Sequence, residues 1–218
     1  MAPIDSLVFA GYRSFDADAD DLFRVKWNTV RIGLDLPSGA EIPALTMPEI
    51  GAFNANINQR IVYTPEPDRG DDWQTPAQTL AMSHGDCEDY AILKYATLLR
   101  AGLFAASLRI VIGEIKSIAG NQPHAWCAAY LDGAWRTLDN KFDQIIGVAD
   151  YMNWLPLAAM HDAGVVRFGR EFTLNDMMRY PGRACDSNAA NYKYEAAWIS
   201  AFAAVVQREY RCLIGKGR

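Results

Sequence analysis

The sequence has little that suits a nucleic-acid-binding or membrane-spanning protein. Its 218 residues carry 21 lysines and arginines against 26 aspartates and glutamates, a net charge of −5. No basic cluster or basic helix face stands out, so nucleic acid is not an expected partner. No apolar run approaches the ~20 residues that a membrane-spanning helix needs. We therefore expect neither nucleic-acid binding nor a membrane span.

Cysteine and histidine are also scarce, with four and three copies. The cysteines are Cys87, Cys127, Cys185 and Cys212, and none forms a CxxC pair, which excludes a zinc ribbon and a thioredoxin-type motif. Cys185 and Cys212 flank a predicted C-terminal helix. They are candidates for a disulfide in an oxidising compartment, and two free thiols are the alternative.

Length and composition indicate one globular domain. Half of the residues are hydrophobic and 22% are charged, which is typical of a folded protein. We expect a single domain over 1–218, with an N-terminal extension at 1–46, a core at 47–145 and a C-terminal extension at 146–218 that ends in a helix. The first fourteen residues lack the features of a signal peptide, so no leader is expected in the sequence as given.

The core is predicted to mix helices with an antiparallel sheet. Thr75, Pro76 and Gln78 form a helix-start signal, with a capping residue, a proline at the first position and a glutamine three residues after the cap. The β-branched stretch 107–115 predicts a strand. The segment after residue 140 is expected to be irregular, with His161 on the surface.

The chain is organised around the stretch His84-Gly85-Asp86-Cys87-Glu88-Asp89, which an apolar helical run follows directly. Cys87 is therefore expected in the first turn of a buried helix. Unpaired backbone N–H groups and the helix dipole at that position favour the thiolate. The alternative is a structural cysteine that only packs, because free cysteine is often buried.

A predicted hairpin brings a histidine and an acid together. Asp132-Gly133 is a strong two-residue turn signal between the strands 124–131 and 134–139. In that register His124 and Asp139 are diagonal neighbours on one face, within reach of each other. A one-residue slip would move Asp139 to the opposite face.

These residues suit nucleophilic catalysis. A Cys87 thiolate attacks a carbonyl, His124 partners the thiolate and protonates the leaving group, and Asp139 orients the imidazole. The backbone N–H of Cys87 is one oxyanion donor. Candidates for a second donor are the side chains of Gln78, Trp73 and Asn58.

The motifs resemble the bacterial transglutaminase-like cysteine peptidases, a family that includes the LapG-type periplasmic proteases. The resemblance covers roughly residues 47–145. It rests on the block from Gly85 to Ala91 with Lys94, on His124-Ala125, and on Leu138-Asp139-Asn140. It implies an α+β fold with a papain-like, transglutaminase-like core, in which the nucleophile lies on a central helix packed against an antiparallel sheet. It assigns the catalytic triad to Cys87, His124 and Asp139.

The resemblance also implies calcium. Asp86 and Glu88 would be ligands, since carboxylate oxygens suit Ca²⁺. The alternative is that Asp86 caps the helix while Glu88 and Asp89 complement its dipole. Negative charges beside Cys87 would raise its pKa, and a bound cation would cancel that effect.

Three functions compete at this stage. The leading one is a cysteine peptidase (a hydrolase) that cleaves a protein or peptide substrate, including cell-surface or exported proteins, with a regulatory protein as a possible partner. The second is acyl transfer through the same triad, as in transglutaminases. The third is a catalytically idle module that binds a peptide or partner protein. The resemblance implies a periplasmic or exported location in a bacterium.

Overall fold

The structure is a computed structural model that describes residues 7, 9, 12–34, 46–65, 72–116, 120–148 and 153–170. Statements about structure below refer to these residues. The chain divides into two compact units, Met1–Gly169 and Arg170–Arg218, and the elements described here belong to the first. The predicted C-terminal helix and the proposed Cys185–Cys212 pair lie outside the described residues.

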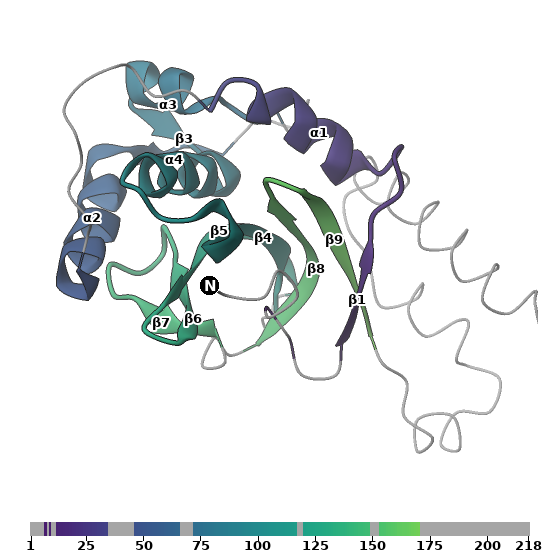
Figure 1. Cartoon of the computed structure of the whole chain (residues 1–218). Helices are drawn as coiled ribbons and strands as arrows, with labels where there is room; N and C mark the ends of the chain where they lie inside the picture. Colours follow the sequence, from purple (N-terminus) through teal and green to yellow (C-terminus); the bar gives the residue numbers. More distant parts are fainter. Residues whose placement is uncertain are drawn as a thin grey trace, which may run out of the picture. The chain divides into compact units, whose positions relative to one another are not determined.

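The centre of the fold is a seven-stranded sheet with the strand order β1-β9-β8-β4-β5-β6-β7 (Figure 1). Its strands are β1 (Tyr12–Asp16), β4 (Leu108–Ile115), β5 (Gln122–Leu131), β6 (Ala134–Leu138), β7 (Ile146–Gly147), β8 (Trp154–His161) and β9 (Gly164–Arg170). From β9 to β7 every neighbouring pair is antiparallel. A separate two-stranded parallel sheet pairs β2 (Val62–Tyr63) with β3 (His84–Gly85).

Four α-helices gather on one side of the curved sheet in Figure 1. They are α1 (Leu22–Arg31), α2 (Met47–Arg60), α3 (Pro76–Met82) and α4 (Cys87–Arg100), and a short 3₁₀ turn, η1 (Ala105–Ser107), precedes β4. The local sequence explains their starts. Asp21 accepts hydrogen bonds from the first turn of α1, and α3 begins with the capping box that Thr75 and Gln78 predict.

Helix α4 is the buried centre of the helical layer. It packs against β4 and β5, against α2 and α3, and against β3. Nearly its whole length is buried, and its fully buried members include Ile92, Leu93, Lys94 and Leu98. A helix enclosed on all sides needs apolar residues around its circumference, which explains the dense apolar run that follows Cys87.

The opposite face of the sheet has its own core. Three tryptophans pack there with small and β-branched side chains from β4, β5 and β8 and with the N-terminal Leu7; the buried members are Leu7, Val111, Trp126, Ala128, Trp135, Val148, Trp154 and Ala159. Strand alternation separates the two cores, because Cys127, between Trp126 and Ala128, points to the helical side. The sheet is therefore buried on both faces.

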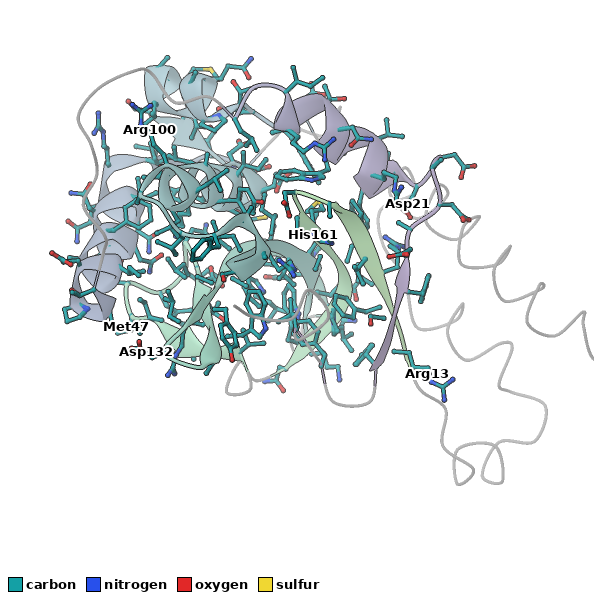
Figure 2. All side chains as sticks on the ribbon, viewed as in Figure 1. Arg13, Asp21, Met47, Arg100, Asp132 and His161 are labelled. Atoms are coloured by element: carbon teal, nitrogen blue, oxygen red, sulfur yellow. The ribbon has the colours of Figure 1, made fainter. Side chains whose placement is uncertain are left out.

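The expectation of an irregular segment after residue 140 is wrong. Strands β7, β8 and β9 lie in that segment, and β8 pairs with β4 along most of its length. The surface position expected for His161 is also wrong, because its side chain is only 5% exposed (labelled in Figure 2). Helix α1 covers this strand, and Trp27 Nε1 donates a hydrogen bond of 2.8 Å to the carbonyl of His161.

The predicted fold class is confirmed. The chain is α+β, and the helix that begins with Cys87 packs against an antiparallel sheet. Among the described residues, none of the helices has the length and apolar character needed to cross a membrane.

Candidate active site

The β5–β6 hairpin forms in the predicted register. Leu131 pairs with Ala134 and Cys127 with Leu138, so Trp126 and Asp139 come next in line. The turn residues Asp132 and Gly133 have φ angles of 48° and 80°, the left-handed conformation that a tight two-residue hairpin requires (Asp132 is labelled in Figure 2). The hairpin prediction is confirmed.

This register places His124 and Asp139 in direct contact. His124 Nε2 lies 2.9 Å from both carboxylate oxygens of Asp139. Both side chains are almost fully buried, at 3% and 1% exposure. Asp139 Oδ1 also accepts a 2.8 Å hydrogen bond from the backbone N–H of Lys141, which holds the carboxylate from its own loop. With Nε2 donating to Asp139, Nδ1 is the imidazole nitrogen that can exchange a proton.

A tryptophan packs against His124. The rings of Trp154 and His124 meet edge to face, with 6.3 Å between their centroids. Gly113, the partner of His124 on β4, makes room for Trp154, because a Cβ at this position would lie 2.5 Å from the indole. No local sequence signal predicts this position of Trp154, since it depends on the pairing of β4 with β8.

Cys87 occupies the first position of α4, as predicted, and is partly exposed. Its Sγ donates a 3.1 Å hydrogen bond to Glu88 Oε2. The backbone N–H of Ala125 also hydrogen-bonds to this sulfur and lowers the pKa of the thiol. Because Ala125 follows His124 directly, the thiol lies beside the strand residue that neighbours the histidine.

The electrostatics of Cys87 follow the expected effect of the neighbouring carboxylates and oppose the expected effect of the helix N-terminus. Burial raises the pKa of the Cys87 thiol well above its usual value, and the carboxylates of Glu88 and Asp86 raise it further. These effects outweigh the N–H of Ala125 and the helix N-terminus. Together these effects favour the protonated thiol, which donates to Glu88 Oε2.

The acidic residues around Cys87 have different roles. Asp89 Oδ1 accepts a hydrogen bond from the backbone N–H of Gln74, and Asp89 Oδ2 accepts one from that of Asp86, at 2.8 and 3.1 Å. The Asp89 carboxylate passes so close to Gly85 that a Cβ there would lie 2.7 Å from it. Asp89 is therefore structural, and Gly85 is required for its approach. Asp86 is the N-cap of α4.

Asp86 and Glu88 fit calcium in the type of donor that they offer. Calcium takes six to eight oxygen ligands, so backbone carbonyls and water would complete the shell around these two carboxylates. In the described part of the chain, no group of three or more His, Cys, Asp or Glu side chains could hold a metal. The region carries excess negative charge: burial and then the charges at Cys87, Asp86 and Glu88 raise the pKa of Tyr63 to about 12.

The three candidates for a second oxyanion donor differ in the contacts that their side chains already make. Asn58 is engaged elsewhere, since its Nδ2 donates to the carbonyls of Asp139 and Phe142. That expectation is therefore wrong, because the amide has no hydrogen left for substrate. The Gln78 side chain accepts from Thr75 in the capping box and is exposed. Trp73 lies under the Lys26 ammonium, 5.4 Å from the ring centroid.

Sequence comparison decides the family. The sequence model of the bacterial transglutaminase-like cysteine proteinases matches residues 37–159, more than half of the chain. This protein belongs to that family. It is a cysteine peptidase of the transglutaminase-like type.

Solved structures of one relative give the fold comparison. A structure of Legionella pneumophila LapG is 23% identical over 66% of this chain and 78% of its own, with a TM-score of 0.51. The calcium-bound and EGTA-treated forms of LapG are both 25% identical with TM-scores of 0.48, over 60% of this chain and 75% and 74% of theirs. The comparison with curated proteins gives no match.

Proposed function

We propose that this cysteine peptidase cleaves its protein substrate through a Cys87–His124–Asp139 triad. The observation that carries the proposal is the buried contact of His124 Nε2 with both oxygens of Asp139, at 2.9 Å, one residue from the N–H that reaches the Cys87 sulfur. The contact supports the proposal because it orients the imidazole and leaves Nδ1 as the nitrogen available to accept the thiol proton.

The proposed reaction has two halves. Nδ1 of His124 takes the Cys87 proton as the sulfur bonds to the scissile carbonyl carbon, and the resulting imidazolium then protonates the leaving amine as the C–N bond breaks. Water, deprotonated by the same nitrogen, hydrolyses the thioester and restores the thiol. Asp139 stays ionised throughout and stabilises the imidazolium. The N–H of Cys87, at the open end of α4, donates to the oxyanion.

We further propose that Asp86 and Glu88 hold Ca²⁺. When bound, the ion would offset the negative charge that disfavours the thiolate. Support comes from the hydrogen bond of the thiol to Glu88 and from the direction in which both carboxylates shift the pKa of Cys87. The relative LapG has been described in a calcium-bound form.

The test is the alkylation rate of Cys87 against pH, measured by peptide mapping with iodoacetamide. It is run on the native chain and on His124→Ala, each with calcium and with EGTA. We expect calcium to shift the alkylation profile of Cys87 in the native chain to lower pH. In His124→Ala we expect Cys87 to react more slowly than in the native chain at the same pH. Cys127 is fully buried and is the internal control, because it should stay unreactive in the folded protein.

Two outcomes would contradict the proposal. If the alkylation profile of Cys87 is the same in the native chain and in His124→Ala, His124 does not assist the thiol. If the profile does not change with calcium, Asp86 and Glu88 do not hold an ion that acts on the thiol. A quenched-fluorescent peptide library, read by mass, then reports the reaction: cleaved peptides support hydrolysis, and peptides joined to an added amine indicate acyl transfer. Cys87→Ser is the inactive control.

For the substrate we propose exported or cell-surface proteins, and for the protein itself a periplasmic or exported location. The support is the resemblance to the LapG-type proteases. Fractionation of cells that express the full natural gene product tests the location. Recovery of the protein only in the cytoplasm would overturn it.

A further inference from the structure

A polar network connects Asp139 to the buried Lys94 through the half-buried Asn58. At its centre is Asn58 on α2, whose Nδ2 donates to the carbonyl of Asp139 at 3.0 Å and to the Asp143 carboxylate at 3.1 Å. The other end of the same amide, Oδ1, accepts a 2.7 Å hydrogen bond from Nζ of Lys94 on α4. One side chain thus connects the loop that carries Asp139 to the helix that carries Cys87.

Lys94 is an unusual residue at this position. Its side chain is fully buried, with 0% exposure, inside the helical layer. Burial lowers the pKa of Lys94 to about 8, and the charges of Asp139, Cys127 and Asp143 act in the opposite direction. Its Nζ also lies 5.7 Å from the centroid of the Tyr90 ring. A buried ammonium is costly for stability, which favours a functional reason for keeping it.

The spacing along α4 gives the network its geometry. Lys94 follows Cys87 by seven residues, about two helical turns, so both side chains lie on similar faces of one helix. The nucleophile is at the open end of α4 and the ammonium is deep in its body. Asn58 and Lys94 thereby link the positions of the proposed nucleophile and acid through a rigid element.

We propose that Asn58 and Lys94 are positioning residues that set the place and charge of Asp139 for catalysis. This inference rests on the proposed triad. Asn58 holds the main chain of Asp139, and the ammonium of Lys94 stabilises the ionised carboxylate through the charge interaction between the two groups. Neither side chain touches substrate.

The chain offers a matched control in Asn54. This residue is one helical turn before Asn58 and holds the same loop, because its Nδ2 donates to the carbonyls of Phe142 and Asp143 at 2.8 and 3.0 Å. Asn54 makes none of the hydrogen bonds to Asp139 or Lys94 that Asn58 makes. A loss of loop anchoring alone should therefore appear in both asparagine variants.

The experiment compares kcat and KM of Asn58→Leu, Lys94→Met, Asn54→Leu and Asp139→Asn, each on one peptide selected from the library. We expect Asn58→Leu and Lys94→Met to lower kcat about tenfold or more with little change in KM. Asn54→Leu should lose thermal stability but keep kcat within about threefold of the native chain.

The pH profile separates positioning from a structural role. The native Lys94 loses its charge as the pH rises through about 8, whereas methionine has no charge to lose. The deficit of Lys94→Met in kcat/KM should therefore shrink above pH 8. A purely structural defect would give the same deficit at every pH.

Each outcome decides between the two proposals. Native kcat in Lys94→Met and Asn58→Leu, with Asp139→Asn inactive, overturns the positioning network and leaves the triad standing. A constant Lys94→Met deficit across pH 6.5 to 9.5 also overturns it. Full activity in Asp139→Asn overturns the triad itself. If Asn58→Leu does not fold, Lys94→Met decides, because removing a buried charge is not expected to unfold the chain.

Discussion

The surroundings of Asp139 favour its anion, whereas the surroundings of Cys87 disfavour the thiolate. Around Asp139 three neighbours favour the ionised form: His124 Nε2 lies at 2.9 Å, the N–H of Lys141 donates at 2.8 Å, and the ammonium of Lys94 interacts with its charge. A carboxylate with such partners can stay ionised while almost fully buried.

Around Cys87 the neighbours act against the anion. Burial, Glu88 and Asp86 all raise the pKa of the thiol, and burial, followed by the same charges, raises the pKa of Tyr63 to about 12. Against these influences, the N–H of Ala125 lowers the Cys87 pKa. The histidine–acid pair is therefore assembled in the fold, whereas Cys87, the proposed nucleophile, needs a change in local charge to form the thiolate.

The largest effect is expected when the contact between His124 and Asp139 is disrupted. Asp139→Asn should lower kcat by about 10³–10⁴-fold, because an asparagine favours the wrong imidazole tautomer and cannot stabilise the imidazolium. Steady-state kinetics on a library-derived peptide measures it. A loss below tenfold would mean that Asp139 does not orient the catalytic histidine.

The control for that variant is a change in the helix body. Leu93 is fully buried in a cluster with Ile57, Ile61 and Tyr90. Leu93→Ala should cost about 2–5 kcal/mol of unfolding free energy through the cavity that it leaves. Below the unfolding transition it should keep its turnover, which separates a loss of stability from a loss of chemistry.

A smaller effect, on stability, is expected when the buried charge of Lys94 is removed. Burial lowers the pKa of Lys94 to about 8, so the folded state binds its proton less tightly than the unfolded state does. That charge therefore destabilises the fold fully below pH 8, and the cost fades as the pH rises toward the ordinary lysine value. Lys94→Met should be more stable at pH 7 by about 2 kcal/mol.

Urea denaturation at several pH values measures this gain. The gain should shrink between about pH 8 and 10 and vanish above that range. A Lys94→Met variant less stable than the native chain at pH 7 would show that the hydrogen bond to Asn58 outweighs the cost of burying the charge.

The smallest expected effect concerns the Cys87 half. Glu88→Gln removes the carboxylate that accepts the thiol proton at 3.1 Å. The pKa of Cys87 should therefore fall, and alkylation in EGTA should reach its half-maximal rate at a lower pH. The calcium response of the variant should be weaker than that of the native chain.

A charge-matched control is available on α2. Glu49 is exposed and lies in the first helical turn, where it accepts hydrogen bonds from Thr46. Glu49→Gln should leave the Cys87 profile unchanged. A shift as large as that of Glu88→Gln would point to net charge instead of the local contact.

Much of the core was predictable because its signals are local. The capping box of Thr75 and Gln78, the apolar run after Cys87 and the Asp132-Gly133 turn all act within a few residues, and each appears as predicted. The contact of His124 with Asp139 follows from that turn and from strand alternation.

The missed parts depend on distant partners. Strand β8 contains a proline and several small residues, and its pairing with β4 makes it a strand. His161 is buried because α1, more than a hundred residues earlier, covers it. Asn58 looked like an oxyanion donor, since nothing near it in the sequence shows that a loop beyond β6 uses its amide.

By itself, the sequence determined the fold class, the cysteine at the head of a buried helix and the pairing of histidine with acid. Short-range geometry governs these features: helix periodicity, caps and a two-residue turn. The packing of distant elements determines how strongly each titratable group is desolvated and which distant charged groups lie near it. Burial raises the pKa of Cys87 beyond the effect of the adjacent carboxylates, and Lys94 is linked to Asp139 through Asn58, because desolvation and long-range contacts depend on which elements pack together.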